Sequence, residues 1–253
     1  RRRLEHDRRA ALDLDAERHL ALLLELDRRA VAAVGVGGDL EQRRSVRGYL
    51  DKEVPPETLE AIFILAQRAP SNCNIQPWKV YVASGALKDR IRDQMVAKVM
   101  QGVPFNSDYD YPETFDGEYR KRQVACAVEL YGNMGIERGD KEGRARAHLR
   151  NFQMFDAPHV VFIGMDQAFG ASVAIDVGMY MQTLMLSMTA HGVGCCPQGT
   201  MRYYPDIVRE AFAIDGHINI LLGISFGFED PAVPANQTWI DREPIDKLVT
   251  FKR

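Results

Sequence analysis

The chain has 253 residues, of which 46% are hydrophobic and 26% are charged, and its formal net charge is -3. These proportions are typical of folded globular proteins and exclude a disordered chain. Because there is no basic excess, nucleic acid is not an expected partner. No stretch has the roughly eighteen apolar residues of a membrane helix, and the first residues lack the apolar region of a signal peptide, so we expect a cytoplasmic protein with no membrane partner.

The first 34 residues carry many charges and an apolar stripe at helical spacing, which predicts an amphipathic helical arm. The glycines of segment 35–38 predict a hinge, because no strand precedes them and the dinucleotide-binding spacing is absent. We therefore expect residues 1–38 to form an arm with a hinge, and 39–228 to form the main domain. Residues 229–253 have little apolar period, which predicts a tail lying across another surface.

Within the main domain, Asp39 is a candidate cap for a short helix ending near Gln42. Pro56 suits the first turn of a second helix, which must end before Pro70. Residues 69–78 follow as a polar, ordered loop between prolines. The later elements expected are helices at 87–101, 119–134, 141–152, 171–191 and after Pro205, and strands at 79–83, 159–165, 193–196 and 218–226.

The helix at 171–191 is apolar nearly all round, which predicts burial in a domain core or a subunit interface. Gly192 is expected to end it. The segment 102–117 has aromatic residues without any helical or strand period, and such a segment is typical of a lid over a flat ligand. The lid aromatics, with one from the next helix, are Phe105, Tyr109, Tyr111, Phe115 and Tyr119.

Three polar clusters are candidates for chemistry. The first has cations and a hydroxyl suited to a phosphate, the second has amides suited to the edge of a heterocycle, and the third has a glycine that lets the backbone approach a ligand. In order they are Arg43, Arg44, Ser45 and Arg47; Pro70, Ser71, Asn72, Asn74 and Gln76; and Pro197, Gln198 and Gly199. Arg242, in the tail, is a further candidate cation. Taken singly, each cluster is more simply interpreted as a solvated basic turn or a structured turn.

Taken together and in this order, the motifs R-R-S-x-R, A-P-S-x-x-N-x-Q-P-W, A-P-x-V-V, G-V-G with a P-x-G turn, and G-F-x-D resemble the FMN-dependent nitroreductase family over about residues 39–253. The resemblance implies an α+β fold, a mixed sheet sandwiched by helices. It also implies an intertwined homodimer in which each FMN touches both chains and the tail wraps the partner subunit.

The resemblance also implies roles for the clusters. Arg43, Arg44 and Ser45 would hold the phosphate or ribityl chain with Arg242, and Arg47 would approach the polar edge of the isoalloxazine. Pro70, Ser71, Asn72 and Asn74 would come from the partner subunit. The turn at Pro197, Gln198 and Gly199 would place a backbone N–H near flavin N5. The chain departs from the pattern at Gln198, where many relatives have Glu, and at Ile240, where some have Lys.

A flavin carries its own chemistry, so no catalytic side chain and no metal site are expected. NAD(P)H would bind transiently and leave before a nitroaromatic or quinone acceptor enters, which is ping-pong turnover. Two alternatives stay open. One is a dehalogenase or flavin-consuming enzyme, whose lid would grip a zwitterion through Glu118, Tyr119 and Lys121. The other is a redox sensor using Cys195 and Cys196, although reduced buried thiols are the simpler interpretation.

Overall fold

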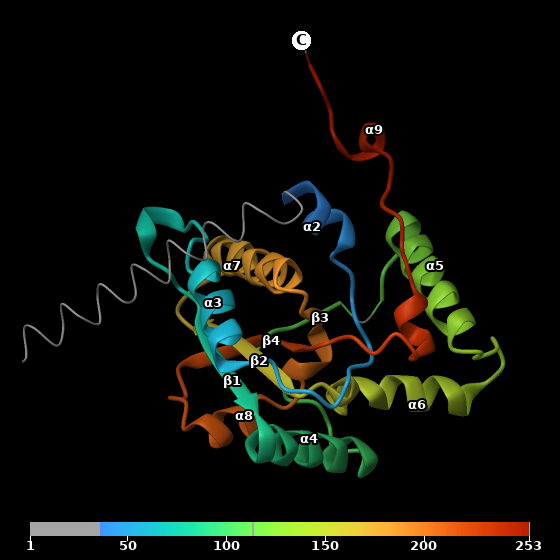
Figure 1. The fold of residues 1–253 in the computed structure, drawn as a ribbon, viewed down its shortest axis with the longest axis horizontal. Coiled ribbons are helices and arrows are strands. Elements are labelled where there is room, and N and C mark those ends of the chain that lie inside the picture. The colour runs from blue at the N-terminus through green and yellow to red at the C-terminus, as the bar shows by residue number, and fades with distance from the viewer. Residues whose placement is uncertain (1–35, 113, 253) are drawn as a thin grey trace, which may run out of the picture.

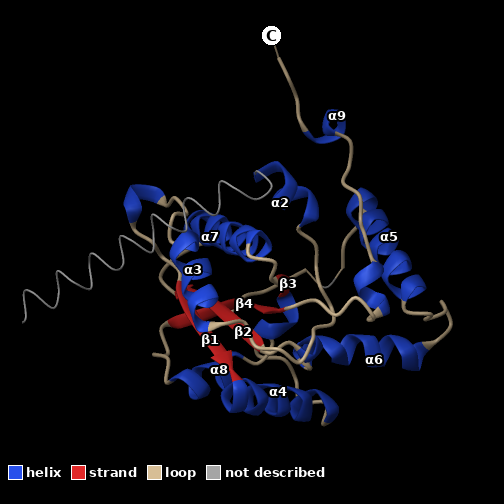
Figure 2. Cartoon of the chain, in the orientation of Figure 1, coloured by secondary structure: helices blue, strands red, loops and turns tan. Residues whose placement is uncertain are grey.

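The computed structural model describes residues 36–112 and 114–252, so the predicted arm at 1–34 lies outside the described residues. The strands are separated along the chain by one or more helices, as the sequence predicts (Figures 1 and 2). The α-helices are α2 (Val36–Gln42), α3 (Pro56–Ala66), α4 (Gly85–Met100), α5 (Gly117–Asn133), α6 (Lys141–Phe152), α7 (Ala171–Ala190), α8 (Pro205–Phe212) and α9 (Ile245–Leu248). The short 3-10 turns are η1 (Asn72–Asn74), η2 (Met154–Asp156), η3 (Gly199–Arg202) and η4 (Pro234–Gln237). The strands are β1 (Lys79–Ser84), β2 (His159–Asp166), β3 (Gly194–Gln198) and β4 (Ile218–Gly227).

The four strands form one sheet in the order β1-β2-β4-β3, and each neighbouring pair is antiparallel. A parallel bridge joins Ser45 to Cys195 at the outer edge of β3. The predicted α+β class is therefore confirmed. The fold places residues 45–49, which come early in the chain, directly beside the strand that ends in the third polar cluster.

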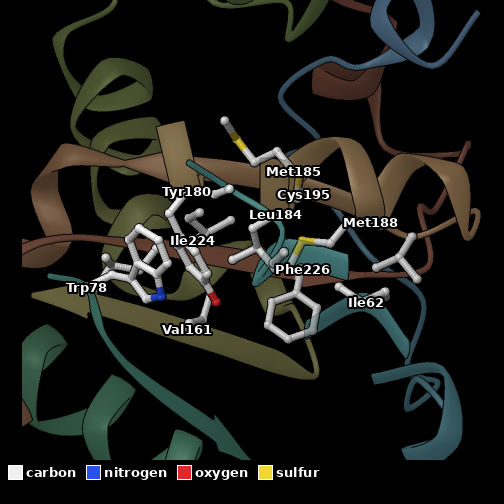
Figure 3. Close-up of a cluster of buried hydrophobic side chains, with 14 of the residues drawn as sticks. Ile62, Trp78, Val161, Tyr180, Leu184, Met185, Met188, Cys195, Ile224 and Phe226 are labelled. Carbon is white, nitrogen blue, oxygen red and sulfur yellow. The ribbon is translucent and has the colours of Figure 1, made fainter. Parts of the chain in front are cut away.

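Helices cover both faces of the sheet, and the sequence of β2 shows why. Side chains alternate between the two faces of a strand. Val161 and Ile163 therefore pack toward α3 and α7, whereas Val160 and Phe162 pack toward α4 and α8. Figure 3 shows the first of these layers, with residues of α7 lying against the sheet. The apolar run from Val160 to Ile163 is thus explained by two cores, one on each face.

The long helix α7 is buried along one face only. Tyr180, Leu184 and Met188 are fully buried, and the Tyr180 ring stacks on Trp78 at 4.7 Å. On the other face, Ile175 is 65% exposed in the single chain. The helix ends as predicted, since Gly192 follows it with a φ of 69°.

The start of the main domain differs from the expectation. Helix α2 spans Val36–Gln42, so Gly37 and Gly38 of the predicted hinge lie in its first turn, and Asp39 lies inside that turn and does not cap it. Glycine disfavours a helix by only about 1 kcal/mol relative to alanine. A carboxylate in the first turn offsets part of that through the partial positive charge of the helix N-terminus.

After β4 the chain passes through η4 and then leaves the rest of the fold, so that α9 and the C-terminal residues stand away from it (Figure 1). Ile245, Leu248 and Phe251 are exposed on this tail. Within the described ranges, no helix has both the length and the apolar character needed to span a membrane.

Candidate functional site

A groove of about 780 Å³ collects residues of the first polar cluster, the end of β3 and the C-terminal tail. Its walls come from segments that are far apart in sequence. They include Leu40, Glu41, Arg43, Arg44, Ser45, Arg47, Cys126, Gln182, Met185, Pro197, Thr238, Trp239, Ile240, Asp241 and Arg242. The structure thus brings the first cluster, Pro197 and Arg242 together, as the resemblance implies.

Backbone hydrogen bonds fix the first cluster in this wall. Val46 N–H donates to the Cys195 carbonyl at 3.0 Å, which holds the segment along β3. Arg47 N–H donates to Asn236 Oδ1 at 2.6 Å, and Asn236 Nδ2 donates in turn to the Gly48 carbonyl at 2.9 Å. Gly48 is required here, because a Cβ at this position would lie 2.5 Å from the Val233 side chain. The segment is therefore held between β3 and η4.

The side chain of Arg44 is fixed by two groups of the tail. One amino group, Nη2, forms an ion pair with Glu229, and the guanidinium lies over the Trp239 ring at 5.0 Å. The other amino group, Nη1, is buried and has no hydrogen-bond partner among the described residues. A buried donor without a partner is rare in proteins. Arg44 therefore retains a donor that suits an oxyanion in the groove.

The groove is electropositive, because its lining has four arginines and two carboxylates, those of Glu41 and Asp241. Arg242 Nη1 donates to the Ile240 carbonyl at 2.6 Å, which leaves the rest of its fork exposed. Guanidinium groups match phosphate through charge-assisted, bidentate hydrogen bonds. The donor set fits the phosphate of a mononucleotide.

The residues of the third cluster, at the end of β3, differ in their exposure. The Gln198 side chain is buried, donating from Nε2 to the Asn151 carbonyl at 2.8 Å and accepting a bond from Ser225 Oγ. It is therefore a structural residue of the core. Gly199 is exposed at the start of η3. Its main chain is accessible, which is the property that the predicted contact requires.

The second cluster lies away from the groove of its own chain. Asn72 N–H donates to the buried Asp176 near the start of α7 at 3.0 Å, whereas the groove touches α7 further along, at Gln182 and Met185. Pro70, Asn72 and Asn74 are exposed, and Ser71 is half-buried, its hydroxyl accepting a bond from Gln76 N–H. Cys73, Asn74 and Gln76 have positive φ angles, so the loop is tightly turned at these positions. These groups are positioned to meet another molecule.

The lid segment 102–117 is irregular, as predicted, but it does not cover the groove of its own chain. None of the five lid aromatics lines that groove. Phe105 stacks on Tyr203 at 4.2 Å, and Tyr109 packs against the core. Tyr111 and Phe115 meet edge to face at 5.9 Å, while Tyr119 is exposed on α5. The first half of the segment contacts the main domain through Phe105 and Tyr109, although Phe105 stays 52% exposed.

The sequence analysis missed three residues of the site: Glu229, Trp239 and Asn236. Their partners are Arg44 for the first two and the backbone of 47–48 for the third. All three lie more than 180 residues along the chain from those partners. The tryptophan in the tail, Trp239, was the available signal.

The adjacent thiols are buried in different clusters, Cys195 toward α7 and Cys196 toward Tyr49. Neighbouring strand residues point to opposite faces. Burial raises the pKa of Cys195 to about 12 and also raises the pKa of Cys196. Thiolate chemistry is therefore disfavoured at both positions.

The model of the nitroreductase family matches residues 40–228, and the chain belongs to this family. The chain is 37% identical to nitroreductase NfnB of Mycolicibacterium smegmatis over 216 residues, covering 85% of this chain and 91% of that protein. It is 36% identical to a 4-nitrobenzoate reductase of Nocardioides sp., covering 83% and 86%. The structure of the FMN-dependent NfnB from Mycobacterium smegmatis in complex with NADPH superposes with a TM-score of 0.81 at 34% identity, covering 91% of this chain and all of that one.

Proposed function

We propose that the protein is an FMN-dependent oxidoreductase that uses NAD(P)H to reduce electron-poor aromatic acceptors, with nitroaromatics as the first class to test. The observation that carries the proposal is the arginine-rich groove, which has a buried, unpartnered Arg44 Nη1. The relatives named above are a nitroreductase and a 4-nitrobenzoate reductase, and the superposed structure is FMN-dependent with NADPH bound.

The residues of the chain bind and orient. Arg43, Arg44, Ser45 and Arg242 would hold the FMN phosphate and ribityl chain, and Arg47 would contact the polar part of the ring system. The exposed main chain of Gly199 would donate to the flavin, with Pro197 and Gln198 shaping the turn. When bound, FMN supplies the hydride chemistry between the nucleotide and the acceptor. The two reactants use the same surface in turn, which is ping-pong turnover.

A homodimer is part of this proposal. Pro70, Ser71, Asn72 and Asn74 lie away from the groove of their own chain, so a second copy supplies them. Apolar side chains exposed on several elements support this arrangement, since large exposed patches mark interfaces. They are Ile175 on α7, Val124 and Val128 on α5, and Ile245, Leu248, Val249 and Phe251 on the tail.

Sedimentation of the FMN-loaded protein at low concentration tests the dimer. Ile175→Lys should shift the protein toward monomer and lower its FMN content. Met100→Lys is the matched control, because Met100 is also exposed but lies on α4 under the opposite face of the sheet. A stable monomer that keeps its flavin would contradict the dimer.

Anaerobic stopped-flow experiments test the turnover. NADPH alone should bleach the flavin, and nitrobenzene or a quinone added afterwards should restore its absorbance at a rate that accounts for steady-state turnover. If bleaching requires the acceptor to be present, the reaction is not ping-pong. If no acceptor restores the colour, the reductase proposal fails.

The alternatives receive less support. On α5, Glu118 and Lys121 form an ion pair with each other at 2.6 Å and are largely exposed, so neither is held ready for a zwitterion. A redox sensor would need reactive thiols, and the raised pKa values of Cys195 and Cys196 disfavour this role.

A further inference from the structure

One cation, Arg202, lies beside the turn where the reactants are proposed to stack. A Cβ at the Gly199 position would lie 3.5 Å from Arg202 Nη1. Pro197, two residues before Gly199, lines the groove. The Arg202 guanidinium therefore lies next to the exposed main chain of Gly199, which follows the groove-lining Pro197 by two residues.

Two tyrosine rings hold this guanidinium. The Tyr111 centroid lies 4.4 Å from it and the Tyr203 centroid lies 5.8 Å from it. Tyr111 belongs to the lid segment, and that segment is tied down nearby, because Asn106 N–H donates to the Tyr203 carbonyl at 3.0 Å. Stacking on rings orients an arginine while leaving the edge of its planar fork free. Arg202 is thus positioned by its surroundings without being neutralised by them.

Two carboxylates of neighbouring segments have other partners. Asp108 of the lid segment pairs with Arg209 at 2.6 Å and accepts a bond from Ile220 N–H at 2.7 Å, and Asp206 pairs with Lys98. Arg202 forms no ion pair with any residue in the described ranges. Within those ranges the charge of Arg202 is unpaired, so an anion can bind it.

Two buried polar atoms at the same turn lack hydrogen-bond partners among the described residues: Arg202 Nε and Thr200 Oγ1. Buried polar atoms in proteins are nearly always bonded, and leaving one unbonded costs about 1–3 kcal/mol. A guanidinium N–H and a hydroxyl, two residues apart and next to an exposed backbone, are donors suited to the oxygens of a carboxylate or phosphate.

We propose that Arg202 is a specificity-determining residue that binds an oxyanion of the reactant lying against the Gly199 turn. The oxyanion is either the carboxylate of an aromatic acceptor or a phosphate of NAD(P)H. The inference rests on the proposed function, because that function brings both reactants to this turn. If the acceptor supplies the oxyanion, the consequence is a preference for anionic over neutral acceptors of the same shape.

The test compares 4-nitrobenzoate with its uncharged methyl ester in the FMN-loaded wild type and in Arg202→Gln, Arg202→Lys and the control Arg146→Gln. Arg146 is a suitable control because its side chain is 71% exposed on α6 and lies outside the groove. Three quantities are measured: the kcat/KM of each acceptor, the Kd of 4-nitrobenzoate for the oxidised enzyme without NADPH, and the NADPH concentration for half-maximal flavin reduction.

If the oxyanion is the carboxylate of the acceptor, Arg202→Gln should lower the ratio of kcat/KM for 4-nitrobenzoate to that for the ester about 10- to 100-fold. That is the scale of a charge-assisted bond. The Kd of 4-nitrobenzoate should rise by a similar factor, with partial recovery in Arg202→Lys. If the oxyanion is a phosphate, the half-saturating NADPH concentration should rise instead, and the acceptor ratio should stay constant.

Arg202→Gln that behaves like Arg146→Gln in all three measurements would overturn the inference. That failure is distinguishable from failure of the proposed function, because the methyl ester would still be reduced. A protein that holds no FMN, or that reduces neither acceptor, would instead overturn the proposed function and this inference with it.

Discussion

Arg44 offers the sharpest test of how the groove holds a phosphate. Its side chain is only 17% exposed and is oriented by Glu229 and Trp239, and its Nη1 is a buried donor without a partner among the described residues. Replacing it as Arg44→Gln removes the cation and its fork while keeping a polar side chain of intermediate length. The expected result is weaker FMN binding with little loss of fold.

The magnitude follows from the kind of bond that is lost. A hydrogen bond to a charged group contributes about 1.5–3 kcal/mol. At about 1.4 kcal/mol per tenfold change, the Kd for FMN should rise about 10- to 150-fold. The cation-π contact between Arg44 and Trp239 stabilises the position of the tail by only about 0.5–1 kcal/mol, the range for an exposed ring such as Trp239.

The assay is titration of the apoprotein with FMN, followed by quenching of flavin fluorescence. Glu229→Gln separates the orientation of Arg44 from its charge, because it loosens the side chain without removing the cation. The Kd of this variant for FMN should change less than fivefold. Arg146→Gln should leave the Kd at the wild-type value. The reasoning is refuted if Arg44→Gln binds FMN within twofold of wild type, or if Glu229→Gln weakens binding as strongly as Arg44→Gln.

Two further predictions concern stability. Gly48→Ala should lower the free energy of unfolding by about 1–3 kcal/mol, because its Cβ would overlap the Val233 side chain. Gly132→Ala on α5 has no neighbour within 4 Å and should not destabilise. Urea titration compares the two, and equal stabilities would contradict the packing argument. Burial lowers the pKa of His159 below 6.5. The unfolded chain then binds the proton first, so stability present above pH 6.5 should fall as the pH is lowered through the folded pKa. Thermal melts at falling pH should show this loss in the wild type and less of it in His159→Gln.

Much of the framework could be predicted from the sequence, because the relevant signals are local. Strand β2 has an apolar run from Val160 to Ile163 because both of its faces are covered, and the prolines at 55–56 and 70 bracket α3 correctly. The glycines before Asp39 favour a break in the chain, whereas Gly37 and Gly38 lie in the first turn of α2. Propensity at a glycine is worth only about 1 kcal/mol, and the context of α2 outweighs it.

The candidate site was predicted less completely, because its contacts are long-range. Nothing near Arg44 in sequence marks Glu229 or Trp239 as its partners. The lid illustrates the same limit, since aromatic residues without a period indicate only that the segment is irregular. Its docking depends on Asp108 meeting Arg209 and the β4 backbone, which only the folded chain brings together.

The central claim is that the groove between residues 43–47, the end of β3 and the tail holds FMN. Its most direct test is the identity of the flavin released from the purified, denatured protein, measured by mass spectrometry, with reconstitution by FMN if the protein is isolated colourless. The expected result is FMN, at one per chain, and a yellow protein after reconstitution with FMN. FAD in its place, or a protein that binds no flavin at any FMN concentration, would contradict it.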